Sequence, residues 1–116
     1  MIHPKTLFQF KLLHREPHVL TWTVPETLPY FDGHFPKNPI LPAIAVLDGT
    51  LEALKLLTGN RKLSFEKIRS AKFLTIVTPG TVLQICLTSV GGHEWEVEWT
   101  SPQKIVARLK FSLKVR

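Results

Sequence analysis

A histidine and an aspartate near the middle of the chain carry the side chains that proton-transfer chemistry requires. His34 stands in the proline-rich stretch from Gly33 to Pro42, and Asp48 follows within an apolar run. The unperturbed pKa of histidine lies near neutrality, and a carboxylate buried among aliphatic side chains can hold its proton at neutral pH. The two could therefore serve as general base and general acid if the fold brings them together.

The segment that must position Asp48 is predicted to be the one long helix, residues 41–58. Gly49 weakens this prediction, because a glycine inside a helix costs about 1 kcal/mol relative to alanine. We interpret it as a place where another backbone or a ligand approaches closely. Pro42 suits a first helical turn, and Gly59 is a typical stop signal. Apolar residues three or four positions apart predict the buried face, with two more beside it: Ile44, Leu47, Leu51, Leu54, Val46 and Leu57.

Strands are predicted on both sides of this helix. Two precede it, at 7–13 and 18–24, with a turn at 15–17 between them, and residues 25–42 form a predicted irregular loop. Four follow it, at 63–77, 81–90, 94–100 and 104–115. Two strands, a buried helix and then a run of strands indicate one α+β domain over residues 1–116.

The composition limits the classes to which the protein can belong. Fifteen Lys and Arg against nine Asp and Glu give a net charge of +6, which fits nucleic acid, an anionic membrane surface or an acidic protein partner, and equally a scattered, solvated surface. No phosphate-binding glycine loop, helix-turn-helix or zinc-type spacing is present, so no nucleic-acid partner, metal or other cofactor is expected. Cys86 is the only cysteine, and no membrane span or apolar signal core is found, so a reducing cytoplasm is the expected compartment.

The stretch around His34 resembles the signature of the hot-dog fold β-hydroxyacyl-acyl carrier protein dehydratases. That signature reads approximately G-H-F-P-G-x-P-V/I-M/L-P-G, with an acidic residue fourteen positions after the histidine, the separation of His34 and Asp48. Residues 33–36 and 39–42 match it, and a weaker match to K-F-x-x-x-V-x-P-G covers residues 72–80. Lys37 and Ala43 replace two glycines, so the chain resembles a divergent member. The resemblance implies one hot-dog domain, a curved antiparallel sheet wrapped around one long central helix.

The resemblance also implies a role for each site residue. His34 would take a proton from the substrate, Asp48 would protonate the departing hydroxyl, and the backbone amide at Ala43 would stabilise the enolate-like oxygen. The remaining residues expected to contact substrate are Pro42, Phe31 and Phe35. Tyr30 could also line the acyl tunnel, although aromatic residues beside a buried helix more often belong to the core.

The function implied is that of an enzyme, a hydro-lyase that converts 3-hydroxyacyl thioesters to trans-2-enoyl thioesters. The acyl group would be carried by acyl carrier protein or coenzyme A, in fatty acid or related lipid or polyketide biosynthesis. The family resemblance implies a homodimer in which His34 and Asp48 meet from different protomers. A hot-dog acyl thioesterase and a non-catalytic acyl-thioester-binding or accessory subunit remain alternatives. Isomerisation, which the aspartate at 48 suggests, ranks below simple dehydration.

Overall fold

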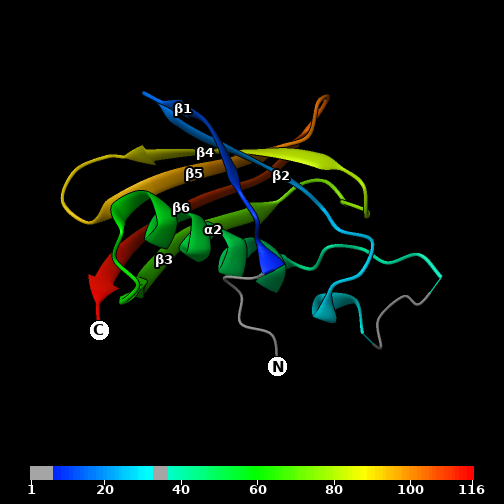
Figure 1. Ribbon diagram of the computed structural model, residues 1–116. Helices are drawn as coiled ribbons and strands as arrows, with labels where there is room; N and C mark the ends of the chain where they lie inside the picture. Colours follow the sequence, from blue (N-terminus) through cyan, green and yellow to red (C-terminus); the bar gives the residue numbers. More distant parts are fainter. Residues whose placement is uncertain (1–6, 33–36) are drawn as a thin grey trace.

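The structure, a computed structural model, describes residues 7–32 and 37–116. In that part of the chain, six strands form one antiparallel sheet in the order β1-β2-β4-β5-β6-β3. Figure 1 shows this sheet curving over helix α2, Ala43–Thr58. The other elements are β1 Lys11–Arg15, β2 His18–Thr23, the short 3₁₀ turn η1 Pro29–Phe31, β3 Leu63–Phe73, β4 Val82–Ser89, β5 Glu94–Thr100 and β6 Ile105–Val115. The predicted α+β class, with a curved sheet around one long helix, is confirmed.

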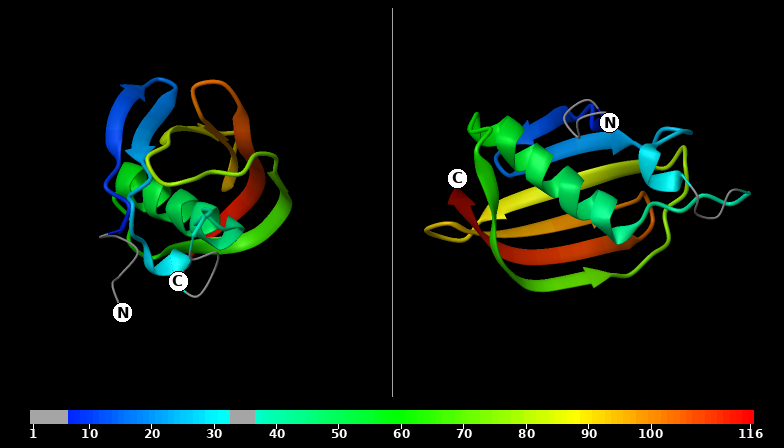
Figure 2. Two further views of the ribbon diagram at one scale, coloured as in Figure 1. Left: turned by 90° about the vertical axis from the view of Figure 1, so that its right-hand side faces the viewer. Right: turned by 90° about the horizontal axis from the view of Figure 1, so that it is seen from below.

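Helix α2 lies across the concave face of the sheet, as Figure 2 shows from two further directions. The residues that it buries are mostly small: Ala45, Val46, Gly49, Thr50, Ala53 and Leu54. The predicted apolar face was partly wrong, because Ile44 is 54% exposed and Leu47, Leu51 and Leu57 are only half-buried. The cause is the aromatic core, whose rings lie against the helix, so that only small side chains fit between them and the helix backbone.

Gly49 is the point where two aromatic rings of the core lie against the helix backbone. A methyl group built on Gly49 would lie 2.8 Å from Phe8 Cε1 and 2.8 Å from Trp99 Cη2. Trp99 is fully buried, and its Nε1 donates to Thr50 Oγ1 at 2.9 Å, while Thr50 in turn donates to the Val46 carbonyl at 2.8 Å. Gly49 is therefore a point of close approach, as predicted, but the expected neighbour was wrong: two aromatic side chains approach it, and not another backbone or a ligand.

Two strand boundaries differ from the predicted ones. β1 begins at Lys11 rather than at residue 7, because Phe8 leaves the ladder and packs against Trp22, with ring centroids 4.8 Å apart. β3 ends at Phe73 rather than at residue 77, because the chain then turns toward the start of α2. There the carbonyl of Val77 accepts a hydrogen bond of 2.8 Å from the amide of Leu41. The other elements lie close to their predicted bounds.

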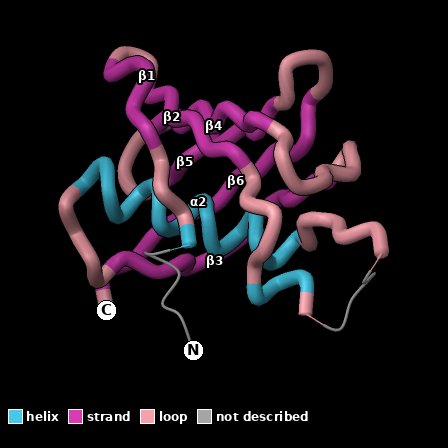
Figure 3. The backbone as a smooth tube through the Cα atoms, turned by 45° about the vertical axis from the view of Figure 1, so that its right-hand side comes forward, coloured by secondary structure: helices cyan, strands magenta, loops and turns pink. Residues whose placement is uncertain are grey.

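β1 and β3 form the two edges of the sheet and lie on opposite sides of it, as can be followed in Figure 3. β3 and the residues after it expose large apolar side chains: Ile68, Phe73, Leu74 and Ile76. An edge strand also presents backbone groups that can pair with another chain. Over residues 7–32 and 37–116, no helix has the length and apolar character needed to cross a membrane.

Candidate functional site

Asp48 lies in the first half of α2 and is half-buried. Because residues three and four apart share one face of a helix, it lies on the face that carries Ile44 and Leu51, beside the residues packed on the sheet. Its Oδ2 accepts a hydrogen bond of 2.6 Å from the hydroxyl of Tyr30. That length is typical of a hydroxyl donating to a carboxylate.

Tyr30 belongs to the short turn η1, which comes before the helix in the chain and is separated from it by a loop. Its ring is half-buried and lies beside Phe8, with ring centroids 6.2 Å apart. Burial, then the hydrogen bond and the charge of Asp48, and then the charge of Glu52, raise the pKa of the Tyr30 hydroxyl well above its ordinary value. The hydroxyl therefore keeps its proton and acts as the donor in this contact.

The start of α2 is held next to the end of β3. Pro42 is the N-terminal cap, with extended φ and ψ angles of −78° and 160°, and Ala43, which is exposed, is the first helical residue. The first helical hydrogen bond is donated by Ala45 to the Pro42 carbonyl at 3.0 Å, so the amide of Ala43 precedes it. The contact between Leu41 and Val77 joins the two segments that match the family signature.

A buried ion-pair cluster lies one helical turn beyond Asp48. Glu52 is 5% exposed and accepts hydrogen bonds from Arg61 at 2.8 Å and from Lys55 at 3.3 Å. Burial alone would raise the pKa of Glu52, but the hydrogen bonds and charges of Arg61 and Lys55 outweigh it and lower that pKa. Glu52 is therefore an ionised carboxylate, and its cluster fixes the second half of α2 against the turn that follows.

The structure accounts for some of the predicted site residues and leaves others as predictions. Asp48, Pro42 and Ala43 lie along the first half of one helix, and Phe31 is half-buried against the core in η1. His34 and Phe35 lie outside the described residues, so their predicted roles stay predictions. Sequence reasoning missed two features of the site. These are the hydrogen bond from Tyr30 to Asp48 and the burial of Glu52. Glu52 stands four positions after Asp48, a spacing that places both on one helix face and could have drawn attention to it.

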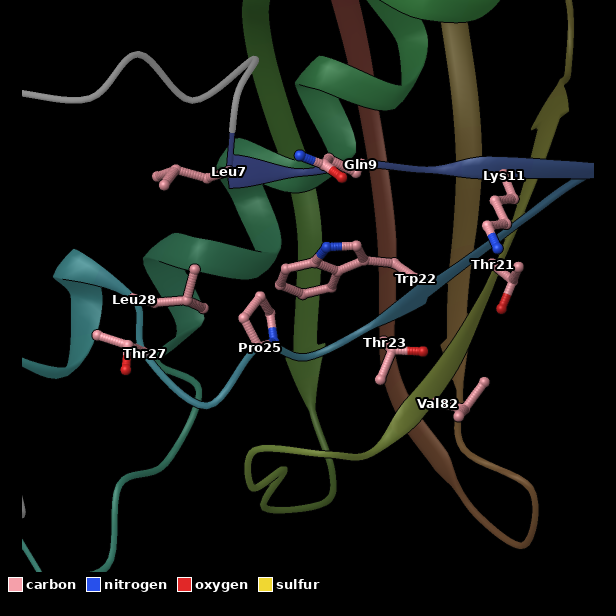
Figure 4. A pocket seen from close by; sticks show the side chains of 10 residues that line it. All are labelled: Leu7, Gln9, Lys11, Thr21, Trp22, Thr23, Pro25, Thr27, Leu28 and Val82. Carbon is pink, nitrogen blue, oxygen red and sulfur yellow. The ribbon is translucent and has the colours of Figure 1, made fainter.

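An open groove with a volume of about 590 Å³ lies beside β2 and the loop that follows it. Figure 4 shows the side chains that line it, which come from the segment before β1 and the first residue of β1, from β2 and its following loop, and from the start of β4. Among residues 7–32 and 37–116, the lining includes Gln9, Thr21 and Leu28 but not Asp48.

Comparisons with known proteins agree on the family. A family model described as ApeI-like, ApeI dehydratase, matches residues 11–114. The 3-hydroxyacyl-acyl-carrier-protein dehydratase of Chlamydia pneumoniae is 33% identical over 99 residues, which cover 73% of this chain and 65% of that protein. The chain spans between 44% and 65% of the length of the first curated dehydratases that it matches.

Solved structures support the same assignment. The dehydratase heterocomplex ApeI:P from Xenorhabdus doucetiae is similar with a TM-score of 0.74 and 26% identity, covering 85% of this chain and 87% of that one. A hypothetical thioesterase from Streptococcus pneumoniae, solved with coenzyme A, has a TM-score of 0.65 at 14% identity and covers 96% and 89%. The second likeness shows the hot-dog fold alone. Because the family model covers nearly all of the helix and sheet described above, the chain belongs to the ApeI-like dehydratase family, and its fold is the hot-dog fold.

Proposed function

We propose that this chain works as a dimeric dehydratase that removes water from 3-hydroxyacyl thioesters attached to acyl carrier protein. The observation that carries the proposal is Asp48, a half-buried carboxylate on the central helix with a hydroxyl donor on one oxygen. Membership in a dehydratase family supports the reaction class. The predicted base His34 completes the pair that the reaction requires.

The reaction needs one base and one acid. The neutral imidazole of His34 takes a proton from C2 of the substrate, and the electrons of that C–H bond pass first onto the thioester as an enolate-like anion. They then form the C2–C3 double bond as the C3–O bond breaks. Asp48 gives its proton to the departing hydroxyl, which leaves as water. One proton transfer from the imidazolium to the carboxylate, directly or through water, then restores the starting state.

The thioester oxygen becomes negatively charged as the C2 proton leaves, and the start of α2 offers a donor for it. The amide of Ala43 precedes the first intrahelical bond, and the helix dipole favours negative charge at this end. One such donor contributes roughly 3 kcal/mol to lowering the barrier. Alanine in place of the family's glycine keeps this N–H, so the replacement is compatible with the chemistry.

A second copy of the chain is expected to pair along β3. This strand is a sheet edge, and Phe73 and Ile76 at its end expose apolar surface near the start of α2. A two-fold contact there would cover that surface and bring the His34 segment of one protomer toward Asp48 of the other. Because the similar Xenorhabdus doucetiae structure is a heterocomplex, a related but different chain is the alternative partner. Light scattering on the purified chain distinguishes a self-associated dimer from a monomer that awaits another subunit.

The acyl carrier protein is expected to dock on basic residues near the same end of the sheet. Lys72 on β3 lies opposite Arg108 on β6, and both are exposed. Since carrier proteins are acidic, these charges would steer their approach. Lys72→Glu should raise KM for a carrier-bound substrate but not for the coenzyme A thioester. Lys62→Glu, at the other end of β3, is the matched control and should change neither.

The deciding assay incubates the purified protein with 3-hydroxyacyl thioesters of several chain lengths and records enoyl absorbance and free thiol separately. His34→Ala and Asp48→Asn should each lower the enoyl rate by about 10²- to 10⁴-fold. His14→Ala and Glu96→Gln, which alter exposed strand residues, should retain full activity. Full activity in either site variant would refute the mechanism. Release of thiol without enoyl product would show a thioesterase, and tight binding without turnover would show an accessory subunit.

A further inference from the structure

The hydroxyl of Tyr30 contacts one of the two carboxylate oxygens of Asp48, so the two oxygens are not equivalent. Tyr30 donates to Oδ2 at 2.6 Å. Its ring is held in place by the core, since it lies beside Phe8 and packs against the buried cluster. A carboxylic acid has one carbonyl oxygen, which is the better acceptor, and one hydroxyl oxygen, which donates and keeps some acceptor capacity. The Tyr30 donor therefore favours the arrangement in which Oδ2 is the carbonyl oxygen whenever Asp48 is protonated.

We propose that Tyr30 is a positioning residue that places the acid proton of Asp48 on Oδ1, the oxygen that does not accept from Tyr30, for transfer to the substrate. The inference rests on the proposed function, in which Asp48 is the general acid. A histidine is oriented in the same way when a partner on one ring nitrogen decides which nitrogen carries the proton. Tyr30 then has a second effect, because its donor remains on the carboxylate that forms as the proton leaves.

This second effect acts during proton transfer. The Tyr30 hydroxyl stabilises the charge that develops on Asp48 as the proton leaves, and it thereby lowers the barrier of that step. Glu52 is the other carboxylate facing this pair, and its charge is balanced by Lys55 and Arg61.

The first experiment uses Tyr30→Phe, which keeps the ring and removes only the hydroxyl. Because a hydrogen bond to a charged group is strong, kcat should fall about 10- to 100-fold, whereas KM should change little because the phenyl ring keeps its place beside Phe8. Phe10→Leu, which loosens the same aromatic cluster without removing a hydroxyl, is the control and should leave kcat close to its wild-type value.

The second experiment does not depend on activity. Tyr30 is the only tyrosine in the chain, so labelling with ¹³C-tyrosine gives a single phenol signal whose titration follows this residue. In Asp48→Asn the pKa of Tyr30 should fall but stay above its ordinary value, because burial, the largest cause of the shift, remains. Replacing the tyrosine with fluorotyrosine, which keeps a hydroxyl donor on the ring, should preserve the kcat that Tyr30→Phe loses.

The two experiments separate this inference from the proposed function. An unchanged Tyr30 titration in Asp48→Asn would overturn the inference even if the enzyme assay succeeds. A Phe10→Leu variant as slow as Tyr30→Phe would reduce Tyr30 to a structural role and would also overturn it. If wild type has no dehydratase activity, the proposed function fails, whereas the titration still tests the contact itself.

Discussion

Replacing Gly49 with alanine should destabilise the protein, although alanine is the better helix former. The added methyl would lie 2.8 Å from one carbon of Phe8 and from one of Trp99, about 0.7 Å short of an ordinary contact near 3.5 Å. Neither ring can retreat easily, since both are buried and Trp99 is tied to Thr50 by a hydrogen bond. Overpacking of this kind costs up to about 3 kcal/mol, and the helix gains about 1 kcal/mol from alanine. The expected net loss is roughly 1–2 kcal/mol.

Urea denaturation followed by tryptophan fluorescence measures this loss, at one protein concentration because an oligomer's stability depends on it. With a slope near 2 kcal/mol per molar urea, the midpoint should fall by about 0.5–1 M. Phe8→Leu removes one of the two rings that the methyl meets, so Gly49→Ala should cost less in that background. A Gly49→Ala protein as stable as wild type, or equal costs in both backgrounds, would refute the close packing described here.

Three further predictions follow from the buried polar contacts and the edge strand. Thr50→Val should lower stability by about 1–3 kcal/mol, measured by the same denaturation, because it leaves the indole N–H of Trp99 without its acceptor. Glu52→Gln should also destabilise the fold at neutral pH. The pKa of Glu52 is lower in the folded state than in the unfolded state. Its contribution to the free energy of unfolding is therefore fully present above the unfolded-state pKa and is lost as the pH falls through the folded-state pKa. Wild type should therefore lose more stability than Glu52→Gln between neutral and strongly acidic pH, and equal losses would contradict this account. Ile76→Asp should weaken the proposed dimer in light scattering, whereas Val90→Asp, an exposed site in the β4–β5 turn, should not.

Much of the fold could be predicted because the spacing of apolar residues along the sequence indicates which side chains are buried, and thereby whether a segment is a strand or a helix. The alternation of Trp95, Val97 and Trp99 with glutamates placed β5 at its observed bounds, and the capping residues placed the end of α2 at Thr58. The orientation of α2 was harder to predict, because periodicity assumes that the largest apolar residues face the core. Here aromatic rings on the sheet occupy that space, so the helix presents small residues to them and leaves Ile44 exposed.

The candidate site was predictable only as far as the signature motif extends. Asp48, Pro42 and Ala43 were identified from the resemblance to the family signature, and the structure places Asp48 and Ala43 in the central helix and Pro42 at its N-terminal cap. The contact of Tyr30 with Asp48 could not be read from spacing, because it depends on how the irregular loop before the helix folds back. No local sequence pattern determines the path of such a loop, since long-range packing decides it.

Gly49 also determines how far the Asp48 carboxylate can reach. It is the neighbour of Asp48, and the rings packed on it prevent the helix from shifting toward the sheet. A glutamate at position 48 would extend the side chain by one methylene, about 1.5 Å, and the helix could not withdraw to absorb that length. The loop that carries Tyr30 and faces the carboxylate would have to move instead. An evolutionary exchange between aspartate and glutamate at position 48 therefore requires a coordinated change in the aromatic core or in that loop. The packing of the core thus limits which acidic side chain fits at this position.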